Sequence, residues 1–213
     1  YATIPEKGMQ AIPDQIYNKL NHDAILFNRE LVHVKENNSL ILDDNTILES
    51  MKVVFTGDSS KIVLKNHSID YNSSTTIYFS SKVAPPFGNY IHLFPSDELI
   101  NNISVLTSIS KKYSSKPDHL YSITVLDNFF DGSELIPKIK VRLKTYYGGD
   151  VSDFKFLKKF EIKKATIIQK PGFYDQKIDN DKNFIFAGDQ FTNGSIEGAV
   201  ESGLNAAKKV LDN

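Results

Sequence analysis

The chain has 213 residues, of which 40% are hydrophobic and 24% are charged, a balance typical of a globular protein with one large domain or two small ones. A formal net charge of −1 gives no electrostatic reason to expect a nucleic-acid or bulk-membrane partner. The absence of cysteine excludes disulfides, thiolate nucleophiles and cysteine-based metal sites. No stretch has the roughly 20 apolar residues that cross a bilayer, and no signal-peptide pattern occurs, so we expect a cytoplasmic protein.

Residues 1–20 predict an amphipathic helix. Gly8 and Pro13 place its start nearby. The apolar side chains that recur at helical spacing are Met9, Ile12, Ile16 and Leu20. A plain surface helix explains this pattern as well as a functional one does.

Residues 24–56 predict a series of short strands separated by turns. The turn-forming cluster Asp43–Thr46 indicates a hairpin. Asp43 and Asp44 would also suit acid–base or metal chemistry, but Asp and Asn favour turns, and we prefer the hairpin. The expected strands are Ala24–Phe27, Leu31–Val34, Leu40–Leu42, Ile47–Leu48 and Met51–Phe55.

Residues 60–165 alternate between runs rich in β-branched and aromatic residues and polar breakers, which predicts a sheet. Helical spacing begins at Leu135, with Pro137 in the first turn and Gly148–Asp150 as the stop. A short helix is expected over Asp153–Phe160, followed by a last strand over Glu161–Gln169. The earlier strands are expected at Thr75–Lys82, Tyr90–Phe94, Ile103–Ile109 and His119–Leu126.

The C-terminal stretch predicts a buried strand, a tight turn and a long helix. Phe184–Phe186 is the short apolar run, and Ala187-Gly188-Asp189 is a turn of small residues with one acid. The helix begins near Ile196, after residues of the capping type. One helix face consists of small side chains, so we expect its backbone to lie close to whatever it covers: Ala199, Gly203, Ala206, Ala207 and Val210.

This arrangement suits an anionic or electron-rich ligand at the helix start. Free backbone N–H groups and the positive end of the helix dipole both point there. Asp189 can accept hydrogen bonds from ligand hydroxyls, which favours a polyhydroxyl chain over a phosphate at that point. An ordinary strand–turn–helix with small residues for packing is the alternative.

The sequence Ala-Gly-Asp, a short spacer and Ser-Ile-Glu-Gly-Ala-x-x-Ser-Gly resembles the closing flavin-binding motif of the FAD-dependent amine oxidase and phytoene desaturase superfamily. The resemblance implies that Asp189 binds the ribityl or phosphate region of FAD, and that the backbone near Ile196 reaches the flavin pyrimidine carbonyl. It also places Leu31 and Val32 at adenine. The implied cofactor residues are Gly188, Asp189, Ser195, Ile196, Glu197, Ala199, Leu31 and Val32.

The resemblance implies a mixed α and β fold, with a partial FAD-binding domain and an inserted substrate domain that has a largely antiparallel sheet flanked by helices. The expected parts are the middle of the FAD-binding domain (1–58), the substrate-binding domain (59–165) and the C-terminal part of the FAD-binding domain (166–213). No Gly-x-Gly-x-x-Gly turn occurs in the sequence. We therefore expect the C-terminal portion of a longer flavoenzyme, lacking the N-terminal half of its FAD domain.

The implied activity is hydride transfer from a small apolar or amine substrate to flavin, by amine oxidation or C–C desaturation. Two departures put amine oxidation in doubt. Ser195 stands where amine-oxidising relatives place an aromatic residue, and Thr76 aligns with their lysine, with Lys82 out of register. No catalytic residue is identified, no metal site is expected, and the fragment alone is expected to be inactive. The alternative is a stand-alone binding or assembly module that keeps the fold without flavin.

Overall fold

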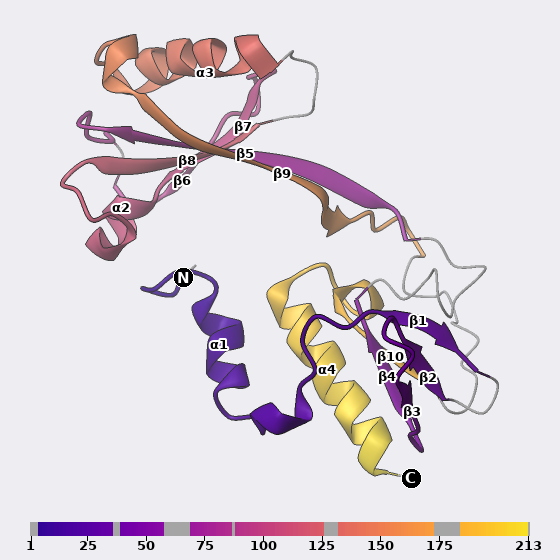
Figure 1. The fold of residues 1–213 in the computed structure, drawn as a ribbon. Helices are drawn as coiled ribbons and strands as arrows, with labels where there is room; N and C mark the ends of the chain where they lie inside the picture. The colour runs from indigo at the N-terminus through magenta and orange to yellow at the C-terminus, as the bar shows by residue number, and fades with distance from the viewer. Residues whose placement is uncertain are drawn as a thin grey trace. The chain divides into compact units, whose positions relative to one another are not determined.

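The structure is a computed structural model that describes residues 4–35, 39–57, 69–86, 88–125, 132–172 and 184–212. The chain forms two compact units from interleaved segments. Unit 1 contains Tyr1–His22 and Ser73–Ala165, and unit 2 contains Asp23–Asn72 and Thr166–Asn213. The architecture is mixed α and β with antiparallel sheets, as expected (Figure 1). In the parts of the chain that the structure describes, every helix is too short or too polar to cross a membrane.

Unit 1 is built on a five-stranded sheet with the order β6-β7-β8-β5-β9. Its central pair is antiparallel, with Ile77 opposite Ile123 and Phe79 opposite Tyr121, and all four side chains are buried. Alternate residues of both strands face the core because side chains in a strand point to opposite faces in turn. The strands are β5 (Tyr71–Ser81), β6 (Ile91–Leu93), β7 (Ile100–Val105), β8 (His119–Val125) and β9 (Lys155–Ile167).

Helix α3 (Gly132–Tyr147) covers one face of this sheet (Figure 1). Leu135, Ile139 and Leu143 recur every four residues, and all three join the buried core of the sheet. The sequence predicted Pro137 in the first turn of this helix, but the residue lies inside the helix. The predicted end of the helix is confirmed. Gly148 takes the left-handed conformation, and its N–H donates to the Lys144 carbonyl at 2.9 Å.

Two predicted boundaries in unit 1 are wrong. The strand expected over Ile103–Ile109 ends at Val105, and α2 (Leu106–Ile109) follows. The Thr107 hydroxyl accepts the N–H of Leu120 at 3.0 Å, so a side chain replaces the backbone ladder at this point. The helix expected over Asp153–Phe160 is instead the 3-10 turn η3 (Val151–Asp153) and the first half of β9.

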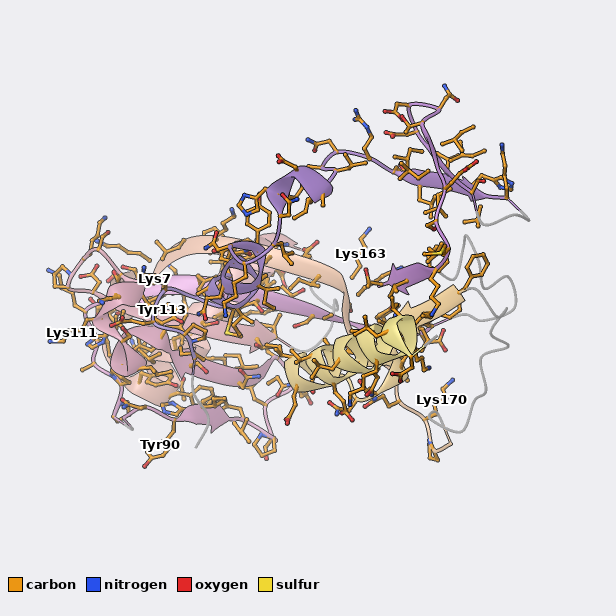
Figure 2. All side chains as sticks on the ribbon, turned by 90° about the horizontal axis from the view of Figure 1, so that it is seen from below. Lys7, Tyr90, Lys111, Tyr113, Lys163 and Lys170 are labelled. Carbon is orange, nitrogen blue, oxygen red and sulfur yellow. The ribbon has the colours of Figure 1, made fainter. Side chains whose placement is uncertain are left out.

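Strand β9 misled the sequence analysis because its apolar residues imitate a helical period. Phe156, Leu157 and Phe160 have helical spacing, yet Phe156 packs against Phe79 and Phe160 against Tyr78 across the sheet. The strand lies last in the sheet order and is exposed over most of its length. Figure 2 shows the side chain of Lys163 on this strand extending from the ribbon. Lysines are common on such edges because their charge opposes further strand pairing.

The N-terminal helix of unit 1 is shorter than the segment from Met9 to Leu20 in which apolar residues recur at helical spacing. Helix α1 spans Ala11–Tyr17 and has no buried residue. The segment before it is attached through the Tyr113 hydroxyl, which donates to the Pro5 carbonyl, and by an ion pair of 2.8 Å between Lys112 and Glu6. Tyr113 and Lys112 belong to the 3-10 turn η2 (Lys111–Tyr113).

Unit 2 begins with η1 (His22–Ala24) at its border and continues into a three-stranded antiparallel sheet, β1-β2-β3. The strand predicted over Ala24–Phe27 is wrong, since Ala24 lies in η1 and the following three residues form no regular element. The predicted hairpin is confirmed: Asp44 accepts the N–H of Thr46 at 2.9 Å, and Asn45 is left-handed. The strands are β1 (Leu31–Val34), β2 (Leu40–Leu42) and β3 (Ile47–Leu48).

Candidate functional site

The candidate site lies where two parallel strands of unit 2 end. Strand β10 (Phe184–Ala187) pairs with β4 (Val53–Thr56) in parallel, so Ala187 stands opposite Thr56. The Phe55 ring contacts the rings of Phe184 and Phe186, with centroids 5.4 and 5.7 Å away, and these contacts hold the pair together. Ligands of open α/β sheets bind beyond the carboxyl ends of parallel strands.

The turn after β10 needs a glycine. Gly188 has φ 149°, and a Cβ added there would clash with the Gln190 side chain. Its N–H donates to the Ser202 hydroxyl at 3.0 Å, and its carbonyl accepts the N–H of Phe191 at 3.1 Å. The 3-10 turn η5 (Asp189–Phe191) follows immediately, so the acid lies directly beside this constrained glycine.

Gln190 joins the turn to the neighbouring strand. Its side chain is 6% exposed, and its amide donates to the Gly57 carbonyl at 2.7 Å. The residues that follow β4 and β10 are therefore fixed to each other by a buried side chain. Burial of an amide without such a partner would be costly, which explains why the bond is made.

Asp189 is half-buried at the centre of this arrangement. Its carbonyl accepts the N–H of Thr192 at 3.2 Å. Its carboxylate has no hydrogen-bond or ion-pair partner among the residues that the structure describes. Both carboxylate oxygens can therefore accept hydrogen bonds from a ligand.

Helix α4 (Ile196–Leu211) begins where the sequence predicts, and Ser195 is its cap. The Ser195 hydroxyl accepts the N–H of Gly198 at 3.0 Å and donates to the Asn193 side chain. A Cβ at Gly198 would clash with the Asn193 carbonyl. Within the described residues, the N–H groups of Ile196 and Glu197 have no acceptor, so they remain available at the positive end of the helix.

The predicted covered face of α4 is confirmed at Ala206, whereas its other four residues are exposed. The buried residues of α4 are Gly198, Ser202 and Ala206, which are spaced four apart. Ala199 and Gly203 are exposed, and nothing lies within 4 Å of a Cβ added at Gly203. Small residues occupy both adjacent stripes of the helix, so residue size alone could not distinguish them.

The structure brings some predicted site residues together and leaves others apart. Gly188 and Asp189 form the turn, and Ser195, Ile196, Glu197 and Ala199 form the start of the helix that Ser202 bonds to that turn. Leu31 and Val32 lie on β1 in a separate sheet of the same unit, where Val32 is 60% exposed.

Sequence reasoning missed Gln190 and Ser202, the two buried polar residues that fix the turn. Both residues belong to the C-terminal segment that resembles the flavin-binding motif, but their hydrogen-bond partners are not evident from the sequence. Gly57 is 133 residues from Gln190, and Gly188 is 14 residues from Ser202. The signal available in the sequence was a polar residue placed among small residues.

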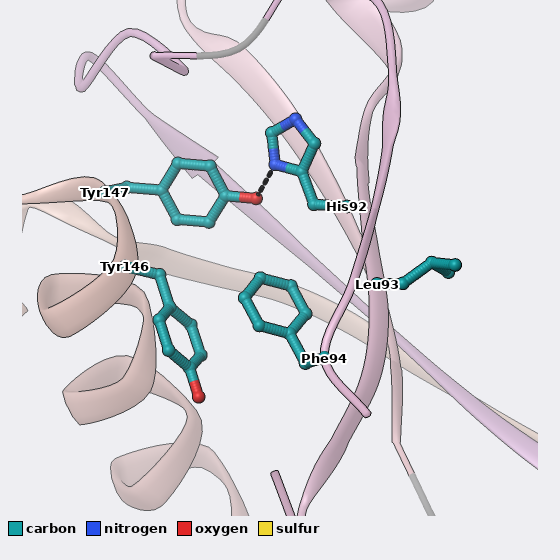
Figure 3. Close-up of a pocket in the computed structure, with 5 residues that line it drawn as sticks. All are labelled: His92, Leu93, Phe94, Tyr146 and Tyr147. Carbon is teal, nitrogen blue, oxygen red and sulfur yellow. Dashed lines mark hydrogen bonds between the residues drawn. The ribbon is translucent and has the colours of Figure 1, made fainter. Parts of the chain in front are cut away.

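Unit 1 has an aromatic pocket of about 390 Å³ (Figure 3). The rings of Phe94 and Tyr146 stack with centroids 4.3 Å apart, and the Tyr147 hydroxyl is hydrogen-bonded to Nδ1 of His92. Burial raises the pKa of Tyr147, so its hydroxyl stays protonated. The Tyr147 hydroxyl and Nδ1 of His92 are bonded to each other, and we assign no chemistry to them. The lining residues are His92, Leu93, Phe94, Tyr146 and Tyr147.

Comparison with known proteins finds a family similarity in the C-terminal part of the chain. Residues 145–211 match the family of flavin containing amine oxidoreductases. This range includes β10, the Gly188–Asp189 turn and α4. No protein of curated function matches the sequence.

Solved structures share the fold at low sequence identity. A reduced UDP-galactopyranose mutase superposes with a TM-score of 0.79 at 14% identity, covering 98% of this chain and 53% of that one. An oxidoreductase from Methanosarcina mazei superposes with a TM-score of 0.73 at 15% identity, covering 99% of this chain and 55% of that one. A protein from Pyrococcus furiosus superposes with a TM-score of 0.71 at 15% identity, covering 96% of this chain and 52% of that one. The chain thus spans about half the length of each.

Proposed function

We propose, from the match of residues 145–211 to the flavin containing amine oxidoreductase family, that the chain is part of an FAD-dependent oxidoreductase that transfers hydride from an organic substrate to flavin. The observation that carries the proposal is the Asp189 carboxylate. It is half-buried, lies beyond the ends of two parallel strands and has no partner among the described residues. An acid in this position suits the hydroxyls of a ribityl chain.

The residues of the site fit FAD in their chemistry. Asp189 would accept hydrogen bonds from ribityl hydroxyls, and Gly188 allows close approach of the backbone because a side chain there would clash. The N–H groups of Ile196 and Glu197 would donate to the flavin pyrimidine carbonyl, and the positive end of α4 favours negative charge nearby. When bound, FAD supplies the hydride acceptor.

The supporting residues of the proposed site keep this geometry in place. Ser195 caps α4 and leaves the two preceding donors of the first turn unused. Ala199 bonds through its N–H to the Ser195 carbonyl at 3.0 Å, which closes that first turn. Leu31 and Val32 would contact adenine, as the resemblance implies.

A complete FAD site requires a pyrophosphate-binding segment as well. We propose that a Gly-x-Gly-x-x-Gly turn comes from outside these residues, in the same polypeptide or in a separate subunit. The match to about half the length of the similar structures supports this proposal. It predicts that the coding sequence upstream of Tyr1 contains a strand, that turn and an acid about 20 residues later.

The substrate is proposed to be a small organic molecule, and desaturation of a C–C bond fits better than oxidation of an amine. Thr76 lies on β5 opposite Thr124, where amine-oxidising relatives would place a lysine, and Lys82 follows the end of that strand. Ser195 is too small to contribute an aromatic wall. We name no catalytic base.

The test is FAD retention by the full-length polypeptide and its Asp189→Asn variant. Loss of charge-assisted hydrogen bonds to ligand hydroxyls should weaken FAD binding about tenfold or more. Flavin absorbance per polypeptide and titration of the apoprotein measure this directly. The control is Asp212→Asn, which removes an exposed acid at the other end of α4 and should retain normal flavin content.

Two results would contradict the proposal. Equal FAD affinity in the Asp189→Asn variant would remove the role given to that carboxylate. Absence of flavin binding by the full-length wild-type polypeptide would favour the alternative, a binding or assembly module that keeps the fold without the cofactor.

A further inference from the structure

Unit 1 contains a second pocket, of about 430 Å³, beside the outer surface of α3. Its walls combine apolar side chains with a few charged ones, as ligand pockets of this size do. Leu99 is buried, whereas Val141 is 52% exposed, so the pocket opens to solvent above an apolar base. The lining residues are Glu98, Leu99, Pro137, Lys138, Val141 and Arg142.

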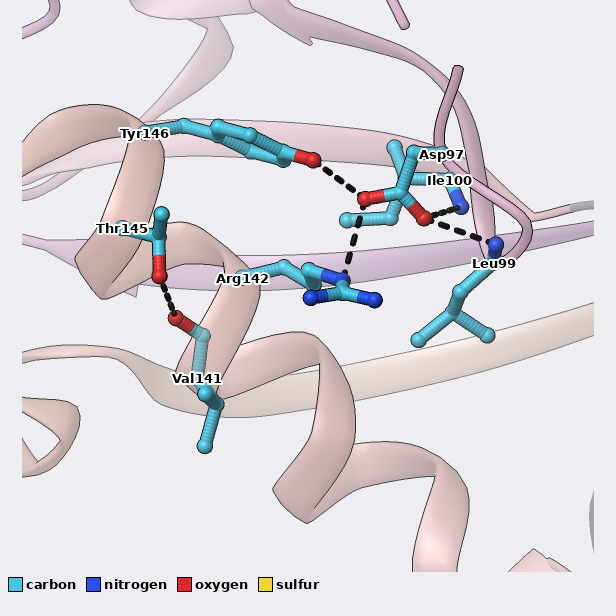
Figure 4. Close-up of polar contacts among 7 residues, drawn as sticks. All are labelled: Asp97, Leu99, Ile100, Val141, Arg142, Thr145 and Tyr146. Atoms are coloured by element: carbon cyan, nitrogen blue, oxygen red, sulfur yellow. Dashed lines mark hydrogen bonds and ion pairs between the residues drawn. The ribbon is translucent and has the colours of Figure 1, made fainter.

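Arg142 is held in a fixed orientation at this pocket. Its Nε lies 3.0 Å from the Asp97 carboxylate, whose side chain is only 2% exposed. Figure 4 shows both terminal nitrogens of Arg142 turned away from Asp97. In the described part of the chain no acceptor is found for these nitrogens, so the two ends of the guanidinium fork remain available.

Asp97 is itself fixed from three sides. One carboxylate oxygen accepts the N–H groups of Leu99 and Ile100 at 2.7 and 3.0 Å. The other accepts the Tyr146 hydroxyl together with Arg142 (Figure 4). A buried, fully bonded carboxylate does not change its position easily, so Arg142 is oriented before any ligand arrives, and little entropy is lost on binding.

The other charges at the pocket restrict the ligand. Lys138 is paired with Glu134 at 2.6 Å, and Asp97 likewise offsets the charge of Arg142, but only Nε of Arg142 is engaged there, so its two terminal nitrogens can still donate to a ligand. Glu98 is exposed and lines the pocket, and no cation among the described residues forms an ion pair with it. Glu98 opposes any anion and opposes one with two negative charges more strongly, so a ligand with a single negative charge is favoured on Arg142.

We propose that this pocket binds a monocarboxylate with an apolar body, such as a medium-chain fatty acid. The carboxylate accepts two parallel hydrogen bonds from the terminal nitrogens of Arg142, a geometry that arginine and carboxylate share. The hydrocarbon part lies against Leu99, Pro137 and Val141. All the proposed cofactor residues lie in unit 2, so this site in unit 1 is independent of the proposed flavin function.

The first experiment titrates octanoate into the 213-residue protein, with methyl NMR signals as the readout. The methyl groups of Leu99 and Val141 should shift in a saturable way, with a dissociation constant on the order of a millimolar for so small a ligand. Core methyl groups such as those of Ile77 should not shift. Absence of saturable shifts at Leu99 and Val141 would overturn the proposal.

Three variants test the role of the charges. Arg142→Gln should weaken octanoate binding about tenfold or more, because it removes a charge-assisted pair. Arg142→Lys keeps the charge beside Asp97 but loses the fork, and it should also bind more weakly. Glu98→Gln, which leaves Asp97 and Arg142 intact, should bind octanoate more tightly. The control Lys144→Gln removes an exposed cation from the same helix and should not change binding.

Ligand variants complete the test. Octyl phosphate should bind more weakly than octanoate because of Glu98, and octylamine should not bind. Equal affinity of octanoate for the Arg142→Gln variant and the wild type would overturn the proposal, as would octylamine binding as tightly as octanoate. Each variant is checked for a cooperative thermal unfolding transition, because loss of the partner of Asp97 lowers the midpoint, and the Glu98→Gln result stands even if an Arg142 variant does not fold.

Discussion

The hydroxyl of Ser202 accepts the N–H of Gly188 at 3.0 Å, and this bond connects the inner stripe of α4 to the turn that carries Asp189. The donor cannot find another partner easily, because Gly188 is held by its unusual φ and by the Gln190 side chain above it. The spacing between the acid and the helix start is therefore set by one buried hydroxyl. It follows that the turn and the helix respond together to mutation.

Ser202→Ala should destabilise the protein by about 1–3 kcal/mol, because the half-buried N–H of Gly188 would lose its acceptor. The free energy of unfolding in urea measures the effect. The neighbouring substitution Glu201→Gln changes an exposed position and should be nearly neutral. An unchanged unfolding midpoint for Ser202→Ala would show that the bond contributes nothing.

The two glycines of α4 should respond to alanine in opposite ways. Gly198→Ala places a Cβ against the Asn193 carbonyl and should destabilise the helix start. Gly203→Ala meets nothing within 4 Å and should stabilise by up to about 1 kcal/mol, through the higher helix propensity of alanine. Thermal unfolding of both variants provides the comparison. Stabilisation by Gly198→Ala would contradict the packing described.

Stability in acid should depend on Asp97. Burial alone would raise its pKa, but hydrogen bonds from Tyr146, Ile100 and Leu99 and the charge of Arg142 outweigh burial and lower the pKa. The contribution is therefore present above the ordinary carboxyl pKa of about 3.9 and is lost as the pH falls toward the lower pKa of the folded state.

Asp97→Asn should accordingly be less stable than the wild type at neutral pH, by on the order of 1–3 kcal/mol, and the difference should shrink in acid. Urea unfolding at several pH values between neutral and about 3 measures this. The variant Asp212→Asn, at an exposed position, should follow the wild-type curve. A constant difference between Asp97→Asn and the wild type at all pH values would contradict the assignment.

Elements with clear local signals could be predicted from sequence. The hairpin around Asn45 was evident because turn residues separate two short apolar runs. The start of α4 followed from Ser195 and the change to helical spacing. In these places the residues that decide the structure are neighbours in the sequence, so a short window contains the information.

Other features depend on partners far along the chain. The face of α4 that is buried depends on Gly188 and β10, and the small residues of the helix do not reveal it. The pair Asp97 and Arg142 forms only because α3 packs on the sheet, and neither residue has a local pattern that announces the other. The first half of strand β9 was mistaken for a helix because the sheet, rather than its own spacing, determines its conformation.

The interleaving of the two units has a consequence for how the chain acquires its structure. During synthesis β4 leaves the ribosome long before β10, and the bond from Gln190 to Gly57 spans 133 residues. All the strands of the five-stranded sheet lie between these two points in the sequence. Pairing over such a separation is slow because a long loop must close first. The half of the molecule that holds Asp189 is thus the last to take shape, with β4 as an unpaired edge until then.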